Sequence, residues 1–246
     1  LANIHLSQKN SSTSEKQAYF NDLRAALEML ETDTDSPSEL ATYSRIATTL
    51  ISQDPFGEDI YSLADKAIEI KNRLFDTEGV AIAKGAIARA SFFIGEEHVK
   101  NSNYPQARHY LKDFQIKVEE WKSASSKTSA PTSVMIMIEN LKAQANIYLG
   151  QIDEKDESFI SHAFVIIKAV MKMKIIPDTN EMSVFRQLVS THSILLELQL
   201  LDNKYTKEFS LDETKNFYQR FKSQFDPYLL SKFEILIKNH ELGWDN

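Results

Sequence analysis

Apolar side chains recur at steps of three and four residues along most of this chain. This spacing places them on one face of an α-helix, and that face is then buried against a neighbouring element. No stretch alternates apolar and polar residues for long enough to predict a strand. The pattern therefore predicts an all-α fold of about ten helices. The clearest apolar stripes predict helices at about 14–30, 133–149, 179–202, 211–225 and 227–242.

Short capping motifs mark where several of these helices begin. Ser36-Pro37-Ser38-Glu39 combines a capping hydroxyl with a proline suited to the first helical position. Its glutamate is placed to accept a hydrogen bond from the backbone amide of the cap residue. Asp178–Glu181 and Ser210–Glu213 repeat the pattern of a cap followed by a glutamate. Asp54-Pro55 and Asp226-Pro227 give the simpler start of an aspartate followed by a proline. Each motif predicts that a helix begins directly after its cap residue.

One polar stretch interrupts the helical pattern. Ser123–Ser133 consists almost entirely of Ser, Thr, Ala and Lys, which is too polar to pack in a core. It is interpreted as an exposed loop between two hairpins of a single domain spanning 1–246, and a domain boundary is the alternative. The acidic run 153–157 is expected to separate two helices, and residues 1–13 are expected to be poorly ordered.

The most informative motif is a pair of predicted helices joined near residue 100. Ile94-Gly95 in the first helix is followed in the second by Tyr104-x-x-Ala107-x-x-x-Leu111-x-x-Phe114. Where two helices cross closely, the contact point has room only for a small side chain, and larger apolar side chains fill the space on either side. Similar spacings recur at Tyr61/Ala64/Ile68, at Ile160/Ala163/Ile167/Val170 and, more weakly, at Leu211/Thr214/Tyr218/Phe221.

This hairpin resembles the tetratricopeptide repeat family. Leu149-Gly150 with Ala163 is a second, looser match, and Ser91, His98 and Glu119 depart from residues that the family often has. The resemblance covers about residues 37–225 and implies a right-handed α-solenoid of about four to five irregular hairpins. The repeats are spaced more widely than the roughly 34 residues of a regular array. A helical domain without repeats is the alternative, because such spacings also arise in any amphipathic helix.

The resemblance also implies a binding surface, because the first helices of tetratricopeptide-like hairpins line a concave groove. The residues that this implies for a partner-binding groove are Arg89, Phe92, Glu96, Val99, Lys100, Gln144, Ile147 and Gln151. Their mixture of polar and aromatic side chains suits an extended peptide or a partner helix. The alternative is an ordinary exposed helix face with one buried phenylalanine.

Composition narrows the class of protein. A hydrophobic fraction of 42% predicts a folded chain, and only 6 Gly and 6 Pro favour long helices over strands. The 28 basic and 35 acidic residues give a net charge of −7, which argues against direct binding of nucleic acid. The absence of cysteine excludes disulfides and thiolate nucleophiles. The most apolar run, Ala163–Met173, is too short to span a membrane.

No motif predicts catalysis, a metal or a cofactor. The chain has no Gly-x-Ser-x-Gly, no Gly-rich phosphate loop and no His-Glu-x-x-His. His98 and His109 can approach each other across the hairpin, so a two-histidine metal site is the minor alternative to His98 as a packed aromatic residue. His192 falls on an apolar stripe and is interpreted as a core residue.

Together these features predict a non-catalytic module that recognises a protein or peptide. Irregular repeats of this kind are similar to the sensory regions of bacterial histidine kinases and transcriptional regulators. A stand-alone cytoplasmic scaffold or adaptor is the alternative, and a homodimer is left open. The chain starts with Leu1 and has no signal region, so we expect a processed or excised part of a longer protein, with an extracytoplasmic location slightly favoured.

Overall fold

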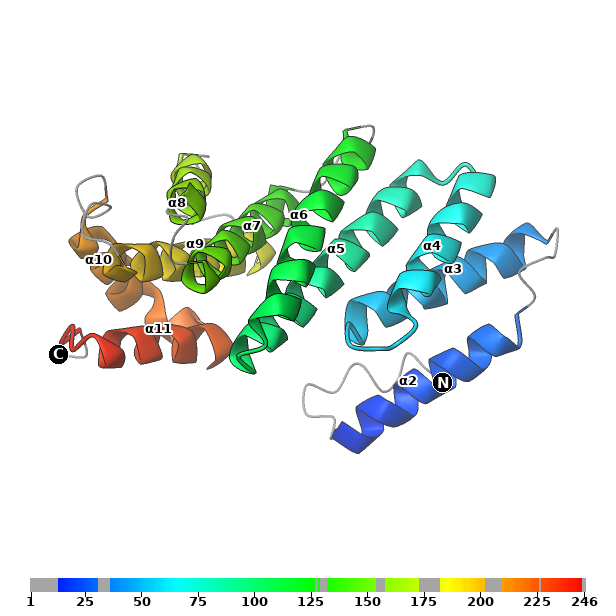
Figure 1. Ribbon diagram of the computed structural model, residues 1–246, viewed down its shortest axis with the longest axis horizontal. Helices are drawn as coiled ribbons and strands as arrows, with labels where there is room; N and C mark the ends of the chain where they lie inside the picture. Colours follow the sequence, from blue (N-terminus) through cyan, green and yellow to red (C-terminus); the bar gives the residue numbers. More distant parts are fainter. Residues whose placement is uncertain are drawn as a thin grey trace. The chain divides into compact units, whose positions relative to one another are not determined.

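The computed structural model describes residues 13–30, 36–126, 128, 132–153, 158–172, 182–201, 209–225 and 227–244. Within these ranges every regular element is helical, with ten α-helices, one short 3-10 turn and no strand (Figure 1). The all-α prediction is therefore confirmed. The segment expected to be poorly ordered, 1–13, lies outside the described residues except for Thr13, which opens the first helix.

The chain divides into two compact units, 1–129 and 130–246, and each is described by itself. The division falls within the serine-rich stretch for which the sequence offers both a loop and a domain boundary. The first unit holds α2 (Thr13–Glu28), α3 (Pro37–Gln53), α4 (Ile60–Arg73), α5 (Thr77–Lys100) and α6 (Tyr104–Ser125). The second holds α7 (Thr132–Ile152), α8 (Ser158–Met171), α9 (Met182–Leu201), α10 (Leu211–Phe221), the 3-10 turn η2 (Lys222–Gln224) and α11 (Pro227–Asn239).

In the first unit, consecutive helices pack side by side. α3 contacts both α4 and α5, α4 contacts α5, and α5 pairs with α6 along most of its length, while α2 lies against α3. A core of buried apolar residues joins α2 to α5. Its members include Tyr19, Leu23, Leu27, Leu50, Ile51, Ile60, Ala64, Ala67, Ala86, Ile87 and Ala90. The small alanines on α4 and α5 let these helices approach closely.

In the second unit, α9 is the central helix. It contacts α7, α8, α10 and α11, and α7 also pairs with α8. An aliphatic core forms among α7, α8 and α9, and an aromatic one joins α9 to the C-terminal helices. The aromatic core includes Phe185, Tyr218, Phe225, Phe233 and Trp244.

Three predicted helix starts are met. α3 begins at Pro37, although the Ser36 hydroxyl lies 3.1 Å from the Ser38 hydroxyl and does not cap the backbone. α10 begins at Leu211, and the Ser210 hydroxyl accepts a hydrogen bond from the Asp212 amide at 3.1 Å. α11 begins at Pro227. Asp226 and the motif at 178–181 lie outside the described residues.

The start predicted at Asp54-Pro55 is wrong, because α4 begins only at Ile60. Asp54 instead ends α3, and its carboxylate pairs with the guanidinium of Arg24 from α2 at 2.9 Å. Asp59 pairs with the same guanidinium at 3.3 Å. A side chain at Gly57 would collide with Arg24. The turn between α3 and α4 is therefore shaped by ion pairs with Arg24 of α2 and not by local capping.

The loop predicted at 123–133 is shorter than expected at both ends. Ser123–Ser125 form the last turn of α6, and residues 132 and 133 open α7. No proline or glycine stops α6, and Ser125 is buried, so the helix continues through these small polar residues. The helix predicted at 211–225 ends at Phe221 and is followed by η2.

Three helices end with a residue other than glycine in the left-handed region. Phe75, Ser102 and Glu241 have φ values of 55°, 57° and 51°. In each case the next amide donates back to the carbonyl five residues earlier, as in the bond from Asp76 to Lys71 at 2.9 Å. This is the arrangement in which glycine is usual at the left-handed position.

Candidate functional site

The α5–α6 hairpin carries a close approach of two helices in the first unit. A Cβ atom added at Gly95 would lie 2.9 Å from Cγ of Leu111 and 3.2 Å from its backbone nitrogen. The close contact predicted at Gly95 is thus present, and its nearest atoms belong to Leu111, one turn beyond Ala107. Ala107 is itself fully buried. Elsewhere along the pair, Gly85 lies beneath the Trp121 indole.

The second hairpin with a glycine, α7–α8, shows a similar contact. A Cβ atom at Gly150 would lie 2.6 Å from Cδ1 of Ile160, and Ala163 is fully buried nearby on α8. In both hairpins, therefore, a glycine near the end of the first helix lies under a branched side chain from the start of the second.

A hydrogen-bonded cluster joins three helices of the first unit. The hydroxyls of Tyr61 on α4 and Ser91 on α5 lie 3.2 and 2.8 Å from the same carboxylate oxygen of Asp113 on α6. The two hydroxyls are 3.0 Å apart. Ser91 is fully buried.

Burial and charge fix which groups of this cluster carry protons. Burial is the main cause that raises the pKa of the Tyr61 hydroxyl, and the negative charge of Asp113 raises it further. Tyr61 therefore stays protonated and donates. The Lys117 ammonium lies 3.6 Å from the other Asp113 oxygen and 5.3 Å from the centre of the Tyr61 ring. A serine nucleophile is usually activated by an adjacent histidine, and no histidine hydrogen-bonds to Ser91 among the described residues.

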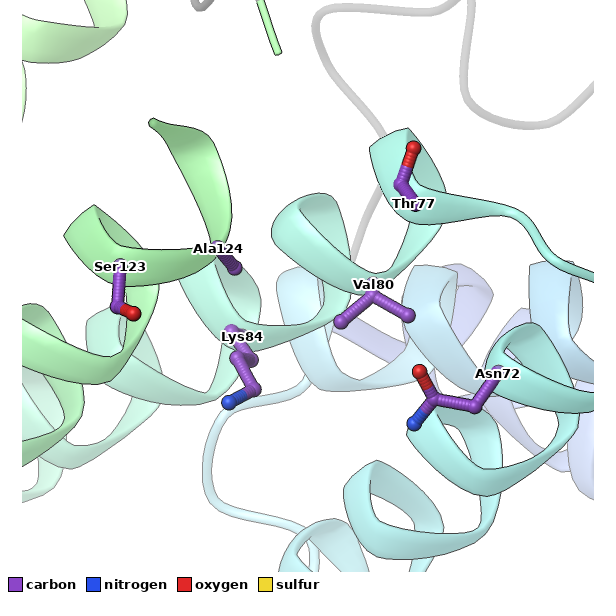
Figure 2. A pocket seen from close by; sticks show the side chains of 6 residues that line it. All are labelled: Asn72, Thr77, Val80, Lys84, Ser123 and Ala124. Carbon is purple, nitrogen blue, oxygen red and sulfur yellow. The ribbon is translucent and has the colours of Figure 1, made fainter. Parts of the chain in front are cut away.

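A small hollow opens between α4 and α6, with α5 as its floor (Figure 2). Its volume is about 210 Å³. Figure 2 shows Asn72 on one side, Ser123 and Ala124 on the other, and side chains of α5 between them. The α5 residues that line it are Thr77, Val80 and Lys84. Pockets for small-molecule ligands usually enclose roughly 300–1,000 Å³, so this hollow has room for about one side chain.

The predicted groove residues of the first unit differ in exposure. Phe92 is only 2% exposed and packs edge-on against Phe114, so it is a core residue and cannot contact a partner. Val99 is half-buried and Lys100 exposed, and the Lys100 ammonium pairs with Glu96 at 3.2 Å. Arg89 is half-buried, and its Nε atom is buried without a hydrogen-bond partner. Burial lowers the pKa of its guanidinium.

The aromatic side chain that shares a helix face with Arg89 is Phe93, which the sequence-based assignment missed. Phe93 is half-buried and follows Arg89 by four residues, at the spacing of one helix face. The sequence does contain a pattern that distinguishes Phe92 from Phe93. Phe92 falls in line with Gly85 and Gly95, the glycines that face α6, and this alignment predicts that it points into the hairpin.

The predicted groove residues of the second unit are mostly buried. Ile147 lies in the aliphatic core and is fully buried. Gln144 is also buried, and its amide donates to Glu197 at 3.2 Å and accepts from the Lys232 ammonium at 3.0 Å. Gln144 thus joins α7 to α9 and α11. Only Gln151, at the end of α7, is exposed.

Three of the histidines, His98, His109 and His192, pack against aromatic rings. His98 stacks on Tyr110 with ring centres 5.5 Å apart, and His109 meets the edge of the same ring. His192 is buried, as predicted, and stacks on Phe217 at 3.8 Å. Among the described residues, no group of three or more His, Asp or Glu side chains is placed to hold a metal ion. Over the same ranges, no helix has the length and apolar character needed to cross a membrane.

No protein-family model, curated protein or solved structure matches this chain.

Proposed function

We propose that this chain is a non-catalytic module that recognises a protein or peptide, as the sensory domain of a bacterial histidine kinase or transcriptional regulator. The observation that carries the proposal is a stripe on α5 formed by Arg89, Phe93, Glu96 and Lys100, which we call the α5 stripe. We further propose that the hairpins form an irregular tetratricopeptide-like solenoid. The packing of α3 on both α4 and α5 supports this arrangement, as does that of α7 on both α8 and α9.

The α5 stripe is held on a rigid helix. One face of α5 packs into the core through Ala86, Ile87 and Ala90. A second face meets α6 through Gly95 and Phe92. The α5 stripe lies on the remaining face. Side chains presented by a well-packed helix lose little conformational freedom on binding, and this favours recognition.

The chemistry of the α5 stripe favours a peptide with an acidic residue beside an apolar one. The guanidinium of Arg89 matches the geometry of a carboxylate, and its buried Nε atom lacks a partner. Phe93 offers a half-buried ring one turn away for an apolar side chain. Burial of these groups strengthens a charged hydrogen bond formed there.

Peptide display tests the proposal. A library of random linear peptides is selected on the immobilised wild-type chain, and binding of the enriched peptides is then measured by fluorescence anisotropy. We expect enriched peptides that pair an acidic and an apolar residue, and a loss of about tenfold or more in affinity for Arg89→Ser with Phe93→Ser. Ile116→Ser, at a 62% exposed position on α6, is the matched control and should bind normally. Enrichment of no peptide, or equal binding to the double variant, would overturn the proposal.

A stand-alone scaffold or adaptor is the second candidate. It is favoured by exposed apolar side chains on both units, such as Ile116 on α6 and Val165 on α8, because an adaptor needs more than one contact surface. The two functions differ in their response to ligand. A sensor should show a ligand-dependent rise in melting temperature and a change in helix packing. An adaptor should purify with constant partners and show no such ligand response.

A further inference from the structure

Phe75 protrudes from the turn between α4 and α5 under backbone strain. Its side chain is 91% exposed, so the ring adds almost nothing to the core. Its φ of 55° lies in the left-handed region, which is unfavourable for every residue with a Cβ atom and most of all for bulky ones. Glycine would fit this helix end better. Strained residues cluster at functional sites, so a strained and exposed phenylalanine indicates a functional role for its ring.

The hollow of Figure 2 lies beside this turn. Asn72 and Thr77, which flank Phe75 in the sequence, line one side of it, and the end of α6 lines the other. A cavity of about 150 Å³ is enough to accept a benzene ring, and the hollow measures about 210 Å³. Val80 and Ala124 give it apolar walls. The ammonium of Lys84 can lie against the face of an aromatic ring, which favours an aromatic occupant over an aliphatic one.

We propose that two copies of this chain associate by inserting Phe75 of each copy into the hollow of the other. The ring and the hollow are neighbours on one surface, so a two-fold axis between the copies satisfies both contacts at once. The surrounding charges are mixed. Lys84 pairs with Glu120 at 3.8 Å and Lys71 pairs with Asp76 at 3.3 Å, so neither sign dominates where the copies meet.

The association should be weak and dependent on concentration. Each buried phenylalanine contributes roughly 150–250 Å², and stable interfaces bury about 1,200 Å² or more. The dimer site uses the face of α5 with Thr77, Val80 and Lys84, whereas peptide recognition is assigned to the α5 stripe. The two proposals can therefore fail independently.

Analytical ultracentrifugation of the full chain, from micromolar to near-millimolar concentration, tests the proposal. We expect a reversible monomer–dimer equilibrium. Phe75→Gly and Ala124→Trp, which remove the ring and fill the hollow, should each raise the dissociation constant about tenfold or more. Phe75→Gly also relieves the strained φ, so an unchanged or higher melting temperature excludes misfolding as the cause. Phe56→Ser, at an exposed phenylalanine on the α3–α4 turn, is the matched control and should dimerise normally.

Mixing the two interface variants provides a second test. Phe75→Gly keeps an open hollow and Ala124→Trp keeps the ring, so a mixed pair retains one of the two contacts. Differently labelled variants should form more mixed dimer than either forms with itself. A wild-type chain that stays monomeric at near-millimolar concentration would overturn the proposal, and so would a dimer that neither substitution weakens.

Discussion

At the scale of single residues, His192 is a buried titratable side chain of the second unit. It is buried against Phe217, and its Nδ1 atom is buried without a hydrogen-bond partner. Burial lowers its pKa from 6.5 to about 4. His192 is therefore neutral near physiological pH, and its protonation opposes the folded state.

Acid should therefore destabilise the second unit through His192. Unfolding returns the pKa to about 6.5, so the unfolded chain binds a proton more readily than the native chain between about pH 6.5 and pH 4. Stability is full above this window, falls as pH is lowered through it, and levels off below it. His192→Phe keeps an aromatic ring against Phe217 but cannot be protonated. We expect urea unfolding from pH 7.5 to about pH 4.5 to show a smaller loss in this variant, by roughly 2–3 kcal/mol.

His162 supplies the control, because it is exposed on α8 of the same unit. His162→Gln should leave the pH dependence of the parent unchanged. Equal acid sensitivity in the parent and in His192→Phe would show that His192 does not carry the effect.

Residue-level prediction succeeded where periodicity decides burial and failed where a contact between helices decides it. The burial of Ala107 and His192 follows from their place on apolar stripes. The Tyr61–Ser91–Asp113 cluster was not predicted, because its members lie on three helices and no local pattern connects them. The contact of Gly95 with Leu111 could not be predicted, since spacing within a helix does not fix how far it slides along its neighbour.

At the scale of elements, the ends of α5 and α11 carry a removable strain. Ser102 and Glu241 occupy the left-handed position that favours glycine. The strain for a residue with a Cβ atom is about 1–2 kcal/mol, and the added flexibility of unfolded glycine offsets about half of it. Ser102→Gly and Glu241→Gly should therefore each stabilise the protein by about 0.5–1 kcal/mol, measured as a higher urea midpoint with an unchanged slope.

Ser126 is the matched control for these glycine substitutions. It also ends a helix, α6, but with a right-handed φ of −61°. Glycine there relieves no strain, increases the entropy of the unfolded chain and removes the hydrogen bond from the Ser126 hydroxyl to the Ser123 carbonyl, so Ser126→Gly should be neutral or destabilising. A gain at Ser126 equal to that at Ser102 would mean that backbone strain is not the source.

Helix existence was predictable from the sequence, but helix boundaries were less so. Stripes of apolar residues located the helices because burial of one face stabilises them whatever their neighbours are. The start of α4 was misplaced by five residues because Asp54 and Asp59 bind Arg24 of α2, and a capping motif carries no information about a distant arginine. The solenoid and the groove remain proposals, because they depend on how hairpins pack on one another.

At the scale of the whole molecule, each compact unit has its own hydrophobic core and its own tryptophan. Trp121 lies on α6 against Gly85 in the first unit. Trp244 belongs to the aromatic core of the second unit. A unit that buries its own apolar surface can in principle fold and unfold by itself. The two tryptophans therefore report on the two units separately.

We expect the units to unfold as separate transitions. Trp121→Phe leaves only the reporter of the second unit, and Trp244→Phe leaves only that of the first. Adding Ser102→Gly should raise the urea midpoint followed by Trp121 alone, and adding Glu241→Gly should raise that followed by Trp244 alone, because each substitution acts within one unit. If either glycine shifts both midpoints equally, the chain unfolds as one cooperative body, and the stability of each core depends on the other.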